Sequence, residues 1–431
     1  MNVFRISLSV LFGILAIAVL TDATTLAQTD RNSPPINYES TKPDDNVARL
    51  AEKLANSEVE LQWDEKHGWL PSFLEALDIP STSQTLVFSK TSQQNRKIRP
   101  SSPRAIYFND NVYLGFVQQG DFLEIAAVDP KQGAIFYTVD QHNSKQPMIA
   151  RSSEQCMSCH ESHKTQDVPG FLVRSVYPKK SGHPDFRLGT EHTDHTTPLQ
   201  NRFGGWYVTG HHGGMRHRGN VFVDESQEGN LDRESGANLN RLPSVARPEL
   251  HLEPTSDIVA LMLLEHQTQF HNFVTQASWT ARQALHQQAT MNELFERTAD
   301  YRSDTTQRRL DSAASELVEY LFFANEFKLT SPVKGRSEFA ESFMSKGVRC
   351  SQGRSLRDLD LQTRMLRYPC SYLVYTESFN ALPKPILEIV KVKMLAVLRE
   401  ENDSETFAHL GARDRKAILE ILGETHPLFR D

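Results

Sequence analysis

Four short runs of strand-forming residues within 104–141 restrict most strongly what this chain can fold into. Each run is rich in aromatic and β-branched residues, and the separators NDN, QQGD and DPKQG consist of turn-forming residues. Because separators this short reverse the chain, each run pairs with its neighbour in sequence. The segment therefore predicts an antiparallel β-meander.

Helical periodicity marks other parts of the chain, mostly after residue 256. Apolar residues at helical spacing occur in 44–56, 69–79, 256–288, 315–327, 383–401 and 414–424. Asp44 or Asp45 is the expected N-cap of the first helix, Ser256 that of the long one, and Gly423 the C-cap of the last. Two short strands, at 205–210 and 220–224, are expected in the Gly-rich and His-rich stretch between the meander and the long helix.

These patterns predict an α+β fold with no internal repeat. We expect a signal peptide over 1–27, an α+β region over 28–250 and a mostly helical region over 251–431. The last two regions can equally form one continuous domain. In this fold class, a β-meander is followed by a loop-rich segment and then by a helical C-terminal half.

The N-terminus predicts export. Arg5 precedes an apolar run over 8–20, and the small residues Thr25 and Ala27 suit a signal peptidase. The run is shorter than the ~20 apolar residues of a membrane span, although an uncleaved anchor stays an alternative. We expect a periplasmic or secreted protein with no membrane span after cleavage. A net charge of -7 gives no reason to expect a nucleic-acid partner.

The sequence CMSCH places Cys156 and Cys159 one helical turn apart, with His160 directly after them. Both sulfurs can then reach the two vinyl groups of one porphyrin, and His160 can bind its iron. Haem c is attached after export, which agrees with the predicted signal peptide. The motif follows strands instead of lying near the N-terminus, so we do not expect a simple class I cytochrome c domain.

Two other chemistries remain open for the same residues. A zinc site could use both cysteines with His160 and His163, and a thiol pair could cycle between reduced and oxidised forms. The sequence does not decide whether Cys350 and Cys370 form a disulfide, because their spatial separation is unknown.

A haem iron bound by His160 needs either a second ligand or an open site. Histidines are concentrated after the motif, and our candidates for the metal are His195, His212 and His217. For the haem propionates we expect donors such as Arg202 and Trp206. Each of these residues can instead be an ordinary hydrogen-bonded or surface side chain.

Several blocks, among them CMSCH, TDHTTP, GGWYVTG and HRGN, resemble secreted bacterial proteins known as cytochrome c domain-containing proteins. The resemblance covers most of the chain from about residue 83 to 423. It implies one covalent haem on Cys156, Cys159 and His160, and export, but no particular reaction. It strengthens His195, His212 and His217, because their blocks recur in the family. His192 and His211 fall where the family has other residues.

The motif therefore predicts an exported single-haem c-type cytochrome that transfers electrons to or from a redox partner protein. The size of the chain favours an alternative, a haem enzyme such as a peroxidase-like oxidoreductase with an open distal site. The sequence indicates neither the redox potential nor the oligomeric state.

Overall fold

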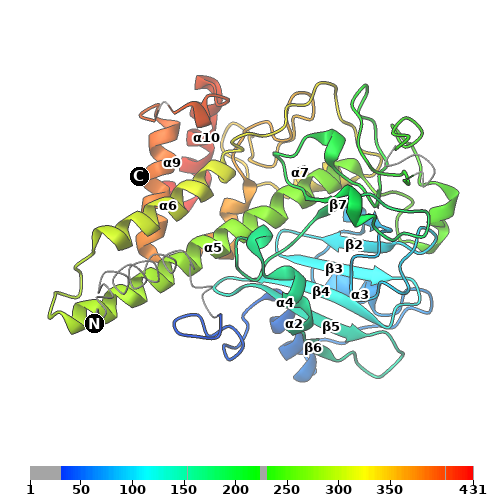
Figure 1. Cartoon of the computed structure of the whole chain (residues 1–431), viewed down its shortest axis with the longest axis horizontal. Coiled ribbons are helices and arrows are strands. Elements are labelled where there is room, and N and C mark those ends of the chain that lie inside the picture. Colours follow the sequence, from blue (N-terminus) through cyan, green and yellow to red (C-terminus); the bar gives the residue numbers. More distant parts are fainter. Residues whose placement is uncertain (1–30, 153, 224–230, 403, 431) are drawn as a thin grey trace, which may run out of the picture.

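An antiparallel sheet of seven strands forms most of the N-terminal half of the described chain (Figure 1). The computed structural model describes residues 31–430 except 153, 224–230 and 403. In spatial order the strands are β6 (Ile149–Arg151), β5 (Gly133–Asp140), β4 (Phe122–Asp129), β3 (Val112–Val117), β2 (Arg104–Phe108), β1 (Thr85–Val87) and β9 (Trp206–Tyr207). Strands β2 to β5 pair in sequence order, so the predicted meander is confirmed.

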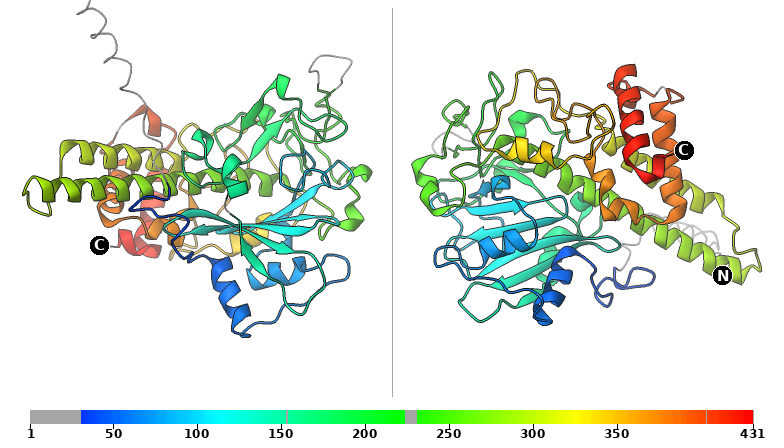
Figure 2. Two further views of the ribbon diagram at one scale, coloured as in Figure 1. Left: turned by 60° about the horizontal axis from the view of Figure 1, so that its bottom comes forward. Right: turned by 180° about the vertical axis from the view of Figure 1, so that it is seen from behind.

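Helices cover both faces of this sheet. Figure 2 shows α2 (Asn46–Ala55) and α3 (Leu70–Ala76) against one face, with the long α5 (Ile258–Leu294) crossing the other. Every residue of β3, in the middle of the sheet, is buried. This double coverage explains why β3 reads as a continuous apolar run rather than an alternating one.

The predicted N-cap is right for α2 and is one residue too early for α5. Asp45 caps α2 by accepting hydrogen bonds from two backbone N–H groups. Helix α5 begins after Asp257, not after Ser256. The Ser256 hydroxyl instead donates to the carbonyl of Tyr207 (2.6 Å) and accepts from the N–H of Leu86 (2.9 Å), so it joins β9 to β1.

The C-terminal half is mostly helical, as expected, and the molecule is an α+β protein. After α5 come α6 (Asp304–Leu321), α7 (Phe339–Ser345), α8 (Glu377–Asn380), α9 (Lys384–Leu398) and α10 (Ala412–Thr425). Helix α10 continues through Gly423 to Thr425 and its C-cap is His426, so the expected C-cap at Gly423 is wrong. Among the described residues, none of the helices has the length and apolarity needed to cross a membrane. The expected signal peptide lies outside the described residues.

The segment between the sheet and α5 is largely irregular. It contains a two-stranded hairpin of β7 (Arg174–Val176) and β8 (Thr190–His192). The strand expected at 205–210 is present as the short β9. The strand expected at 220–224 is not found in its described part, 220–223, where the N–H of Val223 instead bonds the carbonyl of Pro178 (2.8 Å).

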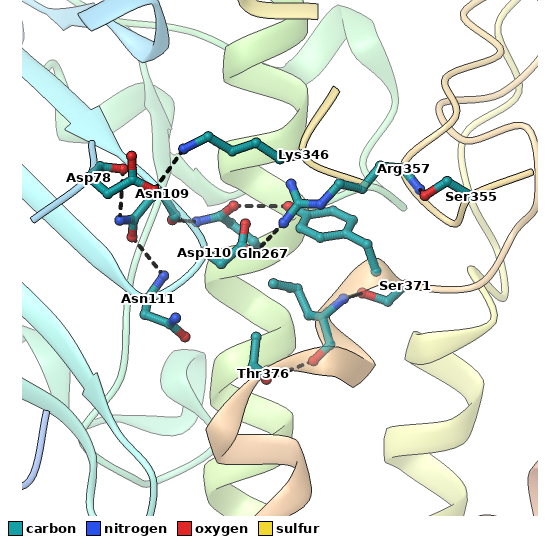
Figure 3. A network of polar contacts seen from close by, with 12 residues as sticks. Asp78, Asn109, Asp110, Asn111, Gln267, Lys346, Ser355, Arg357, Ser371 and Thr376 are labelled. Atoms are coloured by element: carbon teal, nitrogen blue, oxygen red, sulfur yellow. Dashed lines mark hydrogen bonds and ion pairs between the residues drawn. The ribbon is translucent and has the colours of Figure 1, made fainter. Parts of the chain in front are cut away.

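A polar network joins the β2–β3 turn to the C-terminal half (Figure 3). Gln267 on α5 is at its centre: its side-chain nitrogen donates to the carbonyl of Asn109 (2.8 Å) and to the hydroxyl of Tyr113 (2.9 Å), and its oxygen accepts from the hydroxyl of Tyr372 (2.9 Å). Ion pairs Arg357–Asp110 and Lys346–Asp78 flank it. Sheet and helices are thus fastened together by buried polar contacts as well as by apolar packing.

Candidate functional site

The cysteine motif lies on α4 (Glu154–His160), directly after the edge strand β6. Met157 is buried and packs against the core, whereas Cys159 is exposed and Cys156 is partly buried. Neither cysteine is in a disulfide. The helix thus carries one exposed and one partly buried thiol, one turn apart.

His160 is fixed by its neighbours at the end of α4. Its Nδ1 lies 2.9 Å from the carbonyl oxygen of Gly170, and the N–H of Gly170 bonds the carbonyl of His160 (2.9 Å). The ring of Phe136 is 4.7 Å away, centre to centre. Burial lowers the pKa of His160 to about 4, so the imidazole is neutral at pH 7. Nδ1 donates to Gly170, and Nε2 is the nitrogen that can bind a metal.

The thiol environment does not favour redox-active chemistry. Burial raises the pKa of Cys156, although a hydrogen bond to Ser152 partly opposes this. Reactive thiol pairs instead lower the pKa of their nucleophilic sulfur through positive charge or a helix N-terminus. Cys156 is therefore a protonated thiol at neutral pH.

Two arginines act electrostatically on His160. Arg104 is paired with Glu124 through Nη1, and the buried Nε atoms of both Arg104 and Arg174 have no hydrogen-bond partner in the described part of the chain. Arg174 starts β7 and lies directly opposite His192 on β8. Arg174 is one of several arginines near the Gly-rich and His-rich stretch that could be expected from the sequence to meet the haem propionates.

His192 also has an unused nitrogen. Its Nε2 is buried and has no hydrogen-bond partner among the described residues. Burial lowers the pKa of His192 to about 4, and the charges of Lys164 and Arg174 act in the same direction. Hairpin β7–β8 therefore carries a neutral imidazole beside an arginine that also acts on His160.

The three histidines predicted as metal ligands lie elsewhere in two clusters. In the first cluster, the ring centres of His212 and His217 are 4.7 Å apart. Both ring nitrogens of His212 are within hydrogen-bond distance of backbone groups, the carbonyl of Met215 (2.7 Å) and the N–H of Asn238 (3.1 Å). Nδ1 of His217 accepts from the N–H of Gly219 (3.0 Å).

The second cluster consists of His195 and the side chains that surround it on α5 and nearby segments. Nδ1 of His195 is 2.8 Å from Nδ1 of His266, and its Nε2 is buried without a partner among the described residues. The rings of Tyr320 and Phe323 lie 4.2 and 4.7 Å from that of His195. This close packing leaves little space beside the imidazole for a flat macrocycle.

The predicted propionate donors also have protein partners. Arg202, which is 3% exposed, donates to Glu265 (3.2 Å) and to the carbonyl of His195 (2.8 Å). Trp206 donates from Nε1 to the carbonyl of Arg174 (2.8 Å), which helps to hold β7 in place. Their proposed contact with a cofactor remains a prediction.

A cleft of about 840 Å³ opens beside the cluster of His212 and His217. Its lining includes Met215, Arg216 and Glu234, of which the last two form an ion pair with a 2.7 Å contact. The volume suits a small molecule, but no described contact joins these three side chains to α4. The haem-enzyme alternative therefore stays a prediction.

The comparisons with known proteins give no family. Neither the protein-family models, nor the curated proteins, nor the solved structures contain a match to this chain. The resemblance to cytochrome c domain-containing proteins therefore stays a prediction. Within the described residues, no three histidine, cysteine or acidic side chains are assembled in a way that could hold a metal ion. Zinc thus has no preformed site at the motif.

Proposed function

We propose that this protein is an exported single-haem c-type cytochrome that transfers electrons. One observation carries the proposal: α4 holds two free thiols one turn apart, and His160 at its end has Nδ1 occupied by the Gly170 carbonyl. A metal-binding histidine characteristically donates its other ring N–H in this way, because the bond fixes the tautomer and makes the ligating nitrogen more basic.

The residues around α4 fit a covalent haem better than they fit a zinc ion or a redox-active thiol pair. A haem needs two accessible sulfurs and one histidine, whereas a tetrahedral zinc site needs four assembled ligands, which the described residues do not supply. A redox-active pair needs a thiol of lowered pKa, and burial raises the pKa of Cys156. When bound, the haem would supply a one-electron redox couple.

The proposed roles of the chain's own residues follow from their positions. Cys156 and Cys159 would hold the porphyrin, and His160 would bind its iron through Nε2. Arg174, with its unpartnered Nε, would face the anionic propionates, since a guanidinium pairs well with carboxylates. His192 would be a second ligand of the iron, because its neutral Nε2 has no partner among the described residues and its strand partner is Arg174.

The proposal is tested by expressing the full chain with the cytochrome c maturation machinery and measuring a pyridine haemochrome. We expect covalent haem in a one-to-one ratio with protein, resistant to acid-acetone extraction. A variant with Cys156→Ser and Cys159→Ser should contain no covalent haem, and Cys350→Ser should be loaded like the wild type. A colourless wild-type protein whose thiols at Cys156 and Cys159 can be alkylated would overturn the proposal.

A further inference from the structure

A side chain on α5 holds the loop to which His160 is bonded. Asn272 accepts a hydrogen bond at Oδ1 from the N–H of Phe171 (2.8 Å) and donates from Nδ2 to the carbonyl of the same residue (2.9 Å). The carboxamide thus pairs with Phe171 as a neighbouring strand would. Asn272 is fully buried, and its Nδ2 also donates to Gln269 (2.9 Å). Both donors and the acceptor of this amide are therefore used.

The clamp acts on the peptide that follows the His160 contact. Phe171 is bonded covalently to Gly170, whose carbonyl oxygen lies 2.9 Å from Nδ1 of His160. A Cβ at Gly170 would lie only 2.3 Å from Oδ1 of Asn272. Glycine is needed here because the backbone approaches the carboxamide too closely for any side chain. The Asn272 carboxamide therefore packs tightly against Gly170, the residue whose carbonyl bonds the His160 imidazole.

We propose that Asn272 is a positioning residue of the His160 site: by clamping Phe171 it fixes the Gly170 carbonyl, and this carbonyl fixes the tautomer and orientation of the imidazole. The effect on the imidazole needs no cofactor. The effect on iron rests on the proposed function, since a fixed Nδ1–H···O bond makes Nε2 a stronger donor and lowers the reduction potential of the metal that it binds.

The cofactor-free test measures the tautomer of His160 at pH 7 in protein labelled with ¹⁵N-histidine. The His160 signal is identified by its loss in His160→Gln. We expect the Nδ1–H tautomer in the wild type and a shift toward the Nε2–H tautomer in Asn272→Ala. Gly170→Ala should cause the same shift, because the added Cβ displaces the carboxamide from the opposite side.

Thr275→Val is the matched control. Thr275 is buried one turn further along α5, and among the described residues its hydroxyl donates to the helix carbonyl of His271 (2.8 Å). It should leave the His160 tautomer unchanged, even if it destabilises the protein. Circular dichroism shows which variants are folded. Folded Asn272→Ala and Gly170→Ala proteins that both keep the wild-type tautomer would overturn the inference.

Haem-loaded protein supplies the second readout. We expect Asn272→Ala to raise the midpoint reduction potential relative to both the wild type and Thr275→Val. If the wild type takes up no haem, the proposed function fails but the tautomer result stands. If the wild type is loaded and the potentials of Asn272→Ala and Thr275→Val agree, the positioning role toward iron fails by itself.

Discussion

At the scale of single residues, the chemistry of an imidazole here depends on which of its nitrogens the protein already uses. His212 has backbone partners for both nitrogens. Among the described residues, Nε2 has no partner in either His192 or His195, and aromatic rings enclose the His195 imidazole. A metal ligand must present a neutral nitrogen that no other group occupies. By this criterion His192 is a candidate second ligand for the proposed haem, and His212 is not.

Replacing His192 should therefore change the coordination of a bound haem. In haem-loaded protein we expect a low-spin wild type and a high-spin His192→Ala variant, because alanine would remove the proposed second ligand of the iron. Added imidazole should restore the low-spin state, and His212→Gln should remain low-spin. Absorption and electron paramagnetic resonance spectra distinguish the two states. A low-spin His192→Ala spectrum would show that another residue binds the iron.

The sequence predicted the contiguous part of the proposed site and missed the part that is formed by residues far apart in the chain. Cys156, Cys159 and His160 are recognisable because their spacing matches the geometry of a porphyrin. Asn272 lies 101 residues from Phe171, and neither residue belongs to a motif. Such contacts depend on how α5 crosses the sheet, which no local pattern encodes. Residue types alone therefore could not choose between His192 and the other histidines.

At the scale of elements, local patterns located most helices and strands but not all their ends. Runs of aromatic and β-branched residues, with short turn-forming separators, identified β2 to β5, whose pairing is local. Ser256 is a good N-cap by type, but two strands use its hydroxyl and Asp257 caps α5 instead. The apolar run at 220–223 is not a strand because it finds no neighbouring strand to pair with in the described structure.

Helix α5 also joins the sheet to the C-terminal half through the hydrogen bonds of Gln267. A substitution at Gln267 measures how much these bonds stabilise the protein. Gln267→Leu would leave the hydroxyls of Tyr113 and Tyr372 and the carbonyl of Asn109 without this partner. Each unsatisfied buried group costs roughly 1–3 kcal/mol, so with three such groups we expect a loss of at least about 3 kcal/mol in the free energy of unfolding. Urea denaturation measures it. Gln287→Leu, at an exposed position of the same helix, should stay within about 0.5 kcal/mol of the wild type.

At the scale of the whole molecule, the core contains many neutral histidines. Burial lowers the pKa of His195 and His217 to about 3, that of His271 to about 4, and that of His266 well below its ordinary value. In the unfolded chain these groups bind protons below about pH 6.5. The unfolded state then binds more protons than the native state, so stability falls as the pH decreases from 6.5 toward 4.

Two buried glutamates act in the opposite direction. Burial raises the pKa of Glu265 and of Glu326 to about 7. Between about pH 7 and 4.5 the native state binds these protons and the unfolded state does not, so their contribution to stability grows as the pH falls. Below about pH 4.5 both states are protonated and this compensation stops increasing. The loss of stability should therefore steepen there.

A substitution at His271 measures how much one buried imidazole contributes to the pH dependence of stability. Nε2 of His271 lies 2.8 Å from the carbonyl of Asp110, and a glutamine amide can donate the same bond without titrating. Each such histidine contributes about 1.4 kcal/mol per pH unit between its native and unfolded pKa values. His271→Gln should therefore reduce the dependence of unfolding free energy on pH by about that amount between pH 6 and 4.5, whatever its effect at pH 7. Urea denaturation at several pH values provides the slopes, with Gln287→Leu as a control of unchanged slope. Equal slopes for His271→Gln and the wild type would mean that His271 is already protonated in the native core.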